Sequence, residues 1–124
     1  PNRILGFVSA PAIAQRILQS CLDSEVDVGV YAKRRALMAK VLDDAGIAYT
    51  LPRGAFYFFP KSPTADERVF VEALLKERVL AVPGRGFGLP GYFRLAFCAD
   101  AAVIRNSAAS FKRAVEKVKL ETGH

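Results

Sequence analysis

Histidine is nearly absent from this chain of 124 residues, and its single histidine is the last residue, His124. Imidazole is the commonest general acid and base near neutral pH and a frequent zinc ligand. Its scarcity excludes triads of serine, histidine and aspartate, other histidine-based acid–base catalysis and most zinc sites. Any chemistry must come from other side chains.

Cysteine is also scarce, because Cys21 and Cys98 are the only two. Two thiols are too few for a disulfide framework, so the sequence predicts buried free thiols in a reducing compartment. The chain has no apolar run of about 20 residues, and no charged and apolar regions typical of a signal peptide. We therefore expect a soluble, cytoplasmic protein with no membrane partner.

Positive charge is in excess, with 18 lysine and arginine residues against 12 acidic residues. These cations are scattered along the chain, and Lys33-Arg34-Arg35 is their only contiguous run. Aromatic side chains do not alternate with a basic run, as they would on a nucleotide-stacking surface. We interpret the charge as solvated helix faces and expect no nucleic-acid partner. A basic nucleic-acid-binding module stays open as an alternative, and salt would weaken its binding steeply.

The spacing of apolar residues and the capping residues beside them predict four helices. Three cover residues 10–23, 28–45 and 66–78, and the fourth begins at Asp100. Asp27 is the predicted N-cap of the second helix, and Thr64 and Glu67 form a capping-box pattern at the third. The apolar face of the fourth helix consists of Ile104, Ala108, Phe111, Val115 and Val118.

Short runs of aromatic and β-branched residues predict strands at 49–51, 55–59, 79–82 and 92–98. Together with the helices they indicate an α+β fold, in which a small antiparallel-rich sheet is covered by helices. A glycine loop joins the last two strands and matches the G-x-G-x-x-G spacing of dinucleotide-binding proteins. Because Pro90 and a strand follow it, rather than a helix, we interpret the loop as a tight turn.

Arg94 lies in the middle of the last predicted strand, on the face opposite Phe93, Leu95 and Phe97. A guanidinium in an apolar strand is unfavourable unless an anion meets it. Two interpretations follow from the residues: a surface ion pair with an aspartate or glutamate, or a carboxylate ligand. The pattern alone favours the ion pair, because single surface pairs are common.

Four motifs occur in a particular order and spacing along the chain. They are Tyr31-x-x-Arg34-Arg35, Pro52-Arg53-Gly54-Ala55-Phe56-Tyr57, Val82-Pro83-Gly84-x-x-Phe87-Gly88 and Tyr92-Phe93-Arg94-Leu95-Ala96-Phe97. Over essentially all 124 residues the combination resembles the C-terminal part of class I/II aminotransferases. These are fold-type I pyridoxal-phosphate enzymes of the aspartate aminotransferase type. The resemblance implies that residues 1–27 are a helical tail of the large cofactor-binding domain, and that residues 28–124 are the connecting helix and the small C-terminal domain.

The resemblance also implies roles for individual residues in substrate binding. Arg94 matches the family's arginine that binds the α-carboxylate of the amino-acid substrate. Gly54 and Phe56 match the strand whose start faces the substrate entrance, so Phe56 is expected to line the pocket. Arg3 belongs to a stretch that resembles the one approaching the neighbouring subunit's active site. No catalytic residue is expected within the chain itself.

By the same resemblance, the cofactor is pyridoxal phosphate and the substrates are an amino acid and a 2-oxo acid. The family's Schiff-base lysine lies in the large domain, so this chain alone is expected neither to transaminate nor to hold the cofactor covalently. The expected partners are that large domain and a second subunit in a homodimer. A lyase or decarboxylase with the same cofactor stays open, as does a non-enzymatic interaction domain with Arg94 in a structural ion pair. The side chain of the substrate is not predicted.

Overall fold

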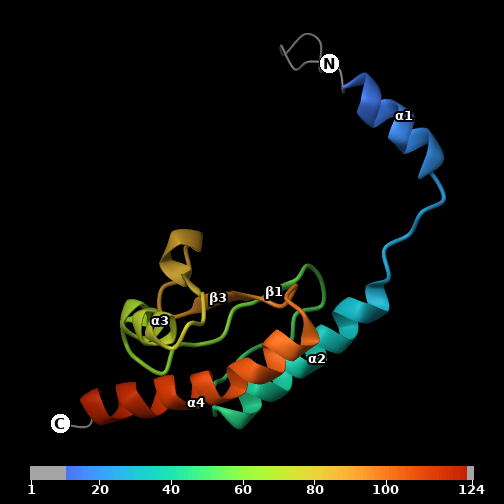
Figure 1. The fold of residues 1–124 in the computed structure, drawn as a ribbon. Coiled ribbons are helices and arrows are strands. Elements are labelled where there is room, and N and C mark those ends of the chain that lie inside the picture. Colours follow the sequence, from blue (N-terminus) through green and yellow to red (C-terminus); the bar gives the residue numbers. More distant parts are fainter. Residues whose placement is uncertain (1–10, 123–124) are drawn as a thin grey trace.

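The computed structural model describes residues 11–122 of the chain. Four helices, a short 3₁₀ helix and three strands follow one another along this part (Figure 1). In chain order they are α1 (Ala12–Ser20), α2 (Val28–Asp44), β1 (Tyr57–Phe58), α3 (Glu67–Lys76), β2 (Val82–Pro83), η1 (Gly84–Phe87), β3 (Phe93–Ala96) and α4 (Ala101–Thr122).

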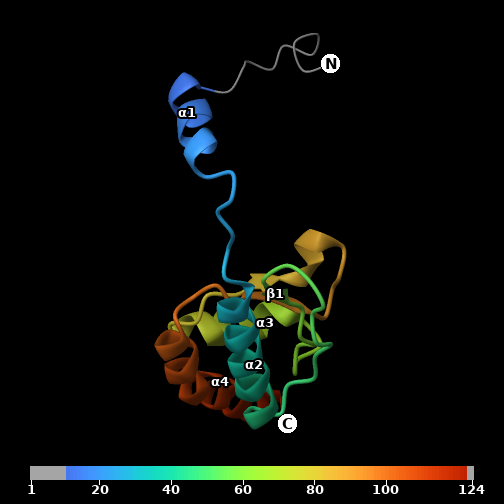
Figure 2. The same cartoon turned by 90° about the vertical axis from the view of Figure 1, so that its right-hand side faces the viewer.

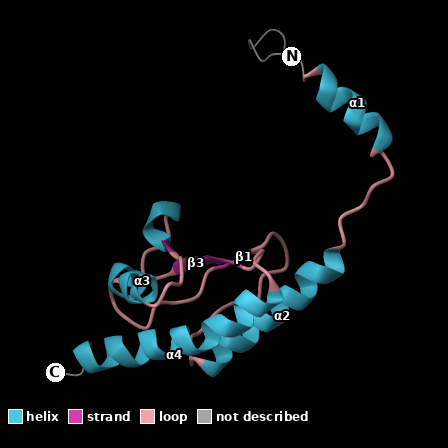
Figure 3. Ribbon diagram, in the orientation of Figure 1, coloured by secondary structure: helices cyan, strands magenta, loops and turns pink. Residues whose placement is uncertain are grey.

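The three strands form an antiparallel sheet in the order β1-β3-β2. Tyr57 pairs with Ala96 on one side of β3, and Val82 pairs with Arg94 on the other. Figures 1 and 3 show α2 and α4 side by side below the sheet, with α3 next to one end of it. The predicted α+β fold is therefore confirmed.

The core lies between the sheet and these three helices. The largest fully buried side chains are mostly aromatic: Phe58, Phe70, Phe93, Phe97 and Phe111. Phe58 and Phe97 meet edge to face with their ring centroids 5.4 Å apart, and Phe70 and Phe93 do the same at 5.2 Å. Edge-to-face contacts suit the quadrupoles of aromatic rings, so they fix how the core packs as well as burying apolar area.

Two sequence patterns give the elements that were expected from them. Asp27 caps α2, because its Oδ1 accepts a hydrogen bond from the backbone N–H of Gly29 at 2.8 Å. The chain leaves this helix through Gly46, whose φ of +68° lies in the left-handed region that favours glycine. The predicted apolar face of α4 points into the core, where Ile104, Phe111, Val115 and Val118 are buried.

The predicted strand at 49–51 is absent, and the strand predicted at 55–59 is reduced to Tyr57 and Phe58. Tyr49 is held through its side chain instead: its hydroxyl donates to Asp43 at 3.2 Å and its ring packs on Phe58. Ala55 has a φ of +54°, a conformation that cannot continue a strand, so β1 begins only after it.

The capping-box prediction for α3 is wrong. Asp66 is the N-cap, since its Oδ1 accepts from the backbone N–H of Arg68 at 3.0 Å. Thr64 instead donates through Oγ1 to the carbonyl oxygen of Asp66 at 2.7 Å. Glu67 is the first residue of α3 and does not form a capping box with Thr64. Its carboxylate points into the protein, where it is fully buried.

Two predictions drawn from composition also fail. Cys21 and Cys98 are free thiols as expected, but both are exposed rather than buried. The run Lys33-Arg34-Arg35 is not simply solvated, because Arg34 donates to the carbonyl oxygen of Cys98 and Arg35 to that of Pro52. Two of the three cations therefore bind backbone carbonyl oxygens, one at Pro52 before β1 and the other at Cys98 after β3.

Helix α1 stands apart from the rest of the structure, joined to α2 by an extended segment (Figure 2). None of its residues is buried, although its apolar residues Ile13, Ile17 and Leu18 recur at helical spacing. The domain boundary expected near residue 27 falls in this connection and stays a prediction. No helix in the described part of the chain is long and apolar enough to cross a membrane.

Candidate functional site

Arg94 occupies the middle strand of the sheet, and its side chain lies on the outer face, away from the core. The expected alternation along β3 is confirmed, because Phe93 and Leu95 are buried while Arg94 is only half-buried. Tyr57 stands opposite Ala96, two residues further along the same face, which is the diagonal position from Arg94. The small Ala96 side chain leaves room for a larger neighbour.

Two aromatic rings contact the Arg94 guanidinium. Its central carbon lies 4.5 Å from the centroid of the Tyr57 ring and 4.3 Å from that of Phe87. Such cation–π contacts use the face of the guanidinium and leave the N–H donors in its plane available for hydrogen bonds. The rings therefore hold the cation in place without neutralising it.

Within residues 11–122, Arg94 has neither an ion-pair partner nor a hydrogen-bond acceptor. The surface ion pair that the sequence pattern alone favours is thus not formed there. Two other arginines in the described part of the chain differ in this respect: Arg34 binds Asp100 and Arg85 binds Glu67. The hydrogen-bond donors of Arg94 are therefore unpaired among residues 11–122.

Further aromatic rings extend this surface on both sides. Phe56 lies against Tyr57 with ring centroids 4.4 Å apart, and Phe59 meets Phe87 edge to face at 5.7 Å. Phe56 is 41% exposed and Phe87 is 48% exposed. The predicted residue Phe56 is therefore close to Arg94 through Tyr57, and the aromatic groups around the cation were not foreseen from the sequence.

The other predicted site residues are not brought next to Arg94. Gly54 lines a cavity of about 240 Å³ between the first turns of α2 and residues 53–55. Phe97, the buried residue directly after β3, forms part of the wall of this cavity, whereas Arg94 does not line it. Arg3 lies outside the described residues.

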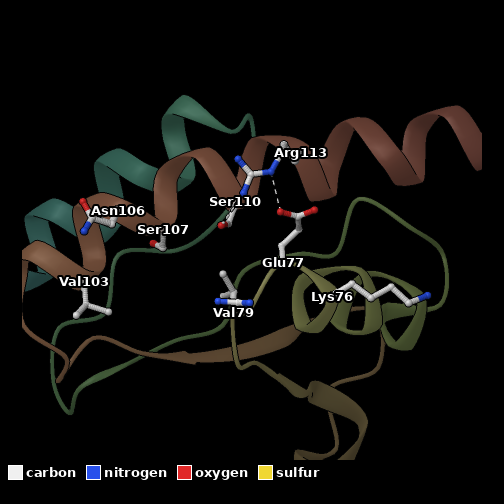
Figure 4. A pocket seen from close by; sticks show the side chains of 9 residues that line it. Lys76, Glu77, Val79, Val103, Asn106, Ser107, Ser110 and Arg113 are labelled. Atoms are coloured by element: carbon white, nitrogen blue, oxygen red, sulfur yellow. Dashed lines mark hydrogen bonds and ion pairs between the residues drawn. The ribbon is translucent and has the colours of Figure 1, made fainter.

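A larger cavity of about 420 Å³ lies between the end of α3 and one side of α4 (Figure 4). Arg113 on α4 donates through Nε to Glu77 at 2.7 Å and through Nη2 to Ser110 at 3.2 Å. The Arg113 guanidinium is already paired with a carboxylate, and no aromatic side chain of the described residues lines this cavity, unlike the surface around Arg94.

The glycine loop between β2 and β3 is a closed turn, as expected. The N–H of Gly84 donates to the carbonyl oxygen of Tyr92 at 2.8 Å, and the N–H of Leu89 donates to that of Gly84 at 3.0 Å. A side chain at Gly84 would collide with both of those backbones. The loop opens a 3₁₀ turn and returns as a strand, so it is not the start of a phosphate-binding helix.

Glu67, at the start of α3, contacts this loop. Its Oε1 accepts from Arg85 Nε at 2.7 Å, and its Oε2 accepts from the backbone N–H of Gly91 at 3.0 Å. The hydrogen bond from the Arg85 guanidinium, followed by that from Gly91, lowers the pKa of Glu67 from 4.5 to about 2. The carboxylate is therefore ionised in the folded protein throughout the neutral range.

The chain belongs to the class I and II aminotransferases, whose family model matches residues 4–111. This places the small sheet, its covering helices and the arginine of β3 within an α+β protein of that family.

Named proteins and a solved structure similar to this chain are also aminotransferases. The chain is 33% identical over 122 residues to the (5-formylfuran-3-yl)methyl phosphate transaminase of Methanocaldococcus jannaschii. The aligned region covers 91% of this chain and 31% of that protein. It is 37% identical over 89 residues to the aspartate aminotransferase of Bacillus subtilis, and this aligned region covers 65% of this chain and 23% of that protein. A crystal structure of an aminotransferase from Eubacterium rectale superposes with a TM-score of 0.83 at 34% identity, over 94% of this chain and 29% of that chain.

The chain thus spans less than a third of the length of these relatives. The family implies pyridoxal phosphate, and the resemblance described above leads to the expectation that a lysine binds it covalently. The seven lysines of this chain all lie within the described part, and all are exposed, six on helices and Lys61 beside the sheet. Lys76 lines the larger cavity, but its ammonium group is already paired with Glu72 at 2.9 Å. The described lysines therefore do not fit the cofactor.

Proposed function

We propose that this chain is the C-terminal part of a pyridoxal-phosphate-dependent aminotransferase, in which Arg94 binds the α-carboxylate of the amino-acid substrate. Residues 28–124 would be the connecting helix and the small domain, and residues 1–27 a tail of the large domain. The observation that carries the proposal is the half-buried guanidinium of Arg94, held by two rings and without an acid partner in residues 11–122.

The geometry around Arg94 suits a carboxylate ligand. A guanidinium offers two parallel N–H donors that match the two oxygens of a carboxylate, so binding fixes the ligand's orientation as well as adding affinity. Orientation matters in this reaction class, since it decides which bond at Cα is broken. The apolar rings of Tyr57 and Phe87 lower the local polarity, which strengthens a charged hydrogen bond formed there.

The remaining assignments follow from membership of the family. The substrates would be an amino acid and a 2-oxo acid, and the cofactor would be held by the large domain, outside this chain. The relatives carry names as different as LL-diaminopimelate, aspartate and aromatic-amino-acid aminotransferase, so we assign no side-chain specificity. All are aminotransferases, which favours amino transfer over the lyase or decarboxylase alternative. A cytoplasmic homodimer, with Phe56 and Gly54 near the substrate entrance and Arg3 near the second subunit, completes the proposal.

The test is Arg94→Lys in the full-length protein that contains this chain. Lysine keeps the charge but loses the fork, and a hydrogen bond to a charged group contributes about 1.5–3 kcal/mol. We therefore expect kcat/KM for the amino-acid substrate to fall by roughly 10- to 100-fold. Arg105→Lys, at an exposed position of α4, is the matched control and should have no effect. An unchanged kcat/KM in Arg94→Lys would refute the assignment.

A further inference from the structure

Glu67 is the one carboxylate among residues 11–122 whose residue is fully buried. Burying an ionised group is unfavourable unless it is paired and hydrogen-bonded, so its partners must account for its place. The mechanism proposed above does not use it, and it lies on α3 rather than in the sheet. Its contacts therefore call for a separate explanation.

The partners of Glu67 lie at the two ends of the glycine loop. At the beginning of the loop, Arg85 donates to Oε1 through Nε at 2.7 Å and to Oε2 through Nη2 at 3.2 Å. At its end, the backbone N–H of Gly91 donates to Oε2 at 3.0 Å. One carboxylate thus holds the loop closed from Arg85 to Gly91, and it anchors the loop to α3.

Phe87 lies inside the segment that Glu67 closes. It is the last residue of η1, which projects from the side of the sheet away from α2 and α4 (Figure 1). Its ring contacts Arg94 and Phe59 and is 48% exposed, so the core does not fix its position. The position of the ring over the guanidinium therefore depends on the shape of the loop. Backbone hydrogen bonds of Gly84 close the loop, and Glu67 adds contacts on both sides of Phe87.

We infer that Glu67 is a positioning residue: by holding Arg85 and Gly91 it keeps Phe87 over the Arg94 guanidinium. For its effect on the substrate this inference rests on the proposed function of Arg94. The effect on Phe87 and Arg94 themselves does not depend on that function and is tested separately.

The discriminating variant is Glu67→Gln, which preserves the shape of the side chain. Glutamine presents one carbonyl oxygen and one NH₂ group, so either the Nε–H of Arg85 or the N–H of Gly91 faces a donor, and the hold on one side of the loop is weakened. Arg85 still binds Asp66, at 3.0 Å, and is not left without a partner. The matched control is Glu72→Gln on the same helix, because Glu72 forms an exposed ion pair with Lys76 at 2.9 Å and does not contact the loop.

The first measurement uses NMR spectra of the 124-residue chain. The rings near Arg94 shift the resonances of its δ and ε protons, and Phe87→Leu identifies the contribution of Phe87. In Glu67→Gln we expect the shift caused by the Phe87 ring to be lost, while the circular dichroism spectrum shows that the chain is still folded. Glu72→Gln should leave the Arg94 resonances unchanged. Unchanged Arg94 resonances in a folded Glu67→Gln chain would overturn the inference.

If Glu67→Gln does not fold, Glu67→Asp is measured in its place. Aspartate keeps the charge but is one methylene shorter, so it cannot reach both Arg85 and Gly91. The same two outcomes, loss or retention of the Phe87 contribution, then support or overturn the inference.

The second measurement is kinetic and uses the full-length protein. We expect Glu67→Gln to raise the KM for the amino acid several-fold with little change in kcat, and Glu72→Gln to change neither. A lost Phe87 contribution together with an unchanged KM would support the positioning of Phe87 over Arg94 but refute an effect of that positioning on substrate binding. A purely structural role of Glu67 would lower stability without moving either the Arg94 resonances or the KM.

Discussion

The guanidinium carbon of Arg94 lies 4.3 Å from the centroid of the Phe87 ring, although Phe87 belongs to the glycine loop and Arg94 to the strand that follows it. Arg94 is fixed by its place in β3, whereas Phe87 reaches it only because the chain turns back through the loop. The loop therefore supplies one of the two rings that contact the cation, whereas the other, that of Tyr57, comes from β1.

The rings that contact Arg94 should strengthen carboxylate binding, because their cation–π contacts hold the guanidinium in place. Replacing Phe87 with Leu removes one cation–π contact, worth about 0.5–2 kcal/mol. We expect the KM of the full-length protein to rise by roughly 2- to 30-fold. Tyr57→Phe keeps the second ring and loses only the hydroxyl, so it should behave as the unaltered protein. A Phe87→Leu variant with an unchanged KM would show that the ring does not contribute to binding.

Gly84 should tolerate no side chain, because a Cβ there would lie 2.6 Å from the carbonyl oxygen of Tyr92 and even closer to that of Leu89. Both obstacles are backbone atoms of the same closed turn. We expect Gly84→Ala to lower the free energy of unfolding by about 1–3 kcal/mol. Gly86→Ala is the control, since nothing lies within 4 Å of its Cβ. Chemical denaturation of the two variants measures the difference, and equal stabilities would contradict the close approach.

Much of this fold could be predicted because local patterns agree with the tertiary structure. The Asp27 cap, the apolar face of α4 and the alternation along β3 each depend on residues close in sequence. The strand predicted at 49–51 failed because its apolar character serves a side-chain contact, that of Tyr49 with Phe58, rather than a ladder of backbone hydrogen bonds.

The candidate site was predictable only in part. Arg94 could be singled out from the sequence because a cation in an apolar strand is unusual, but Tyr57 lies nearly forty residues away and meets it only through the pairing of β1 with β3. Glu67 was misread as a capping residue. One signal could have revealed it: Glu67, Phe70 and Leu74 recur at helical spacing, which places the carboxylate on the buried face of α3.

Arg34 should stabilise the fold mainly through a backbone carbonyl group. It donates to the carbonyl oxygen of Cys98 at 2.9 Å and to Asp100 Oδ1 at 3.0 Å. Its side chain is 19% exposed, whereas that of Asp100 is 83% exposed. Arg34→Gln should lower the free energy of unfolding by about 1–2 kcal/mol, because the carbonyl group loses its partner. Asp100→Asn should lower it by no more than about 0.5 kcal/mol, since exposed ion pairs contribute little. Urea denaturation distinguishes the two, and a larger loss in Asp100→Asn would reverse the argument.

Acid should destabilise the folded chain through the two adjacent carboxylates at the start of α3. Hydrogen bonds from Arg85 and Gly91 lower the pKa of Glu67 from 4.5 to about 2, and those from Arg68 lower the pKa of Asp66 from 3.8 to about 2. A carboxylate with a depressed pKa stabilises the folded state above its unfolded pKa, and this contribution is lost as the pH falls toward the folded value. The melting temperature should therefore decline between about pH 4.5 and pH 2. In Glu67→Gln, which cannot titrate at this position, the decline should be shallower. Melting curves that fall in parallel for both proteins would contradict the pairing of Glu67 with the loop.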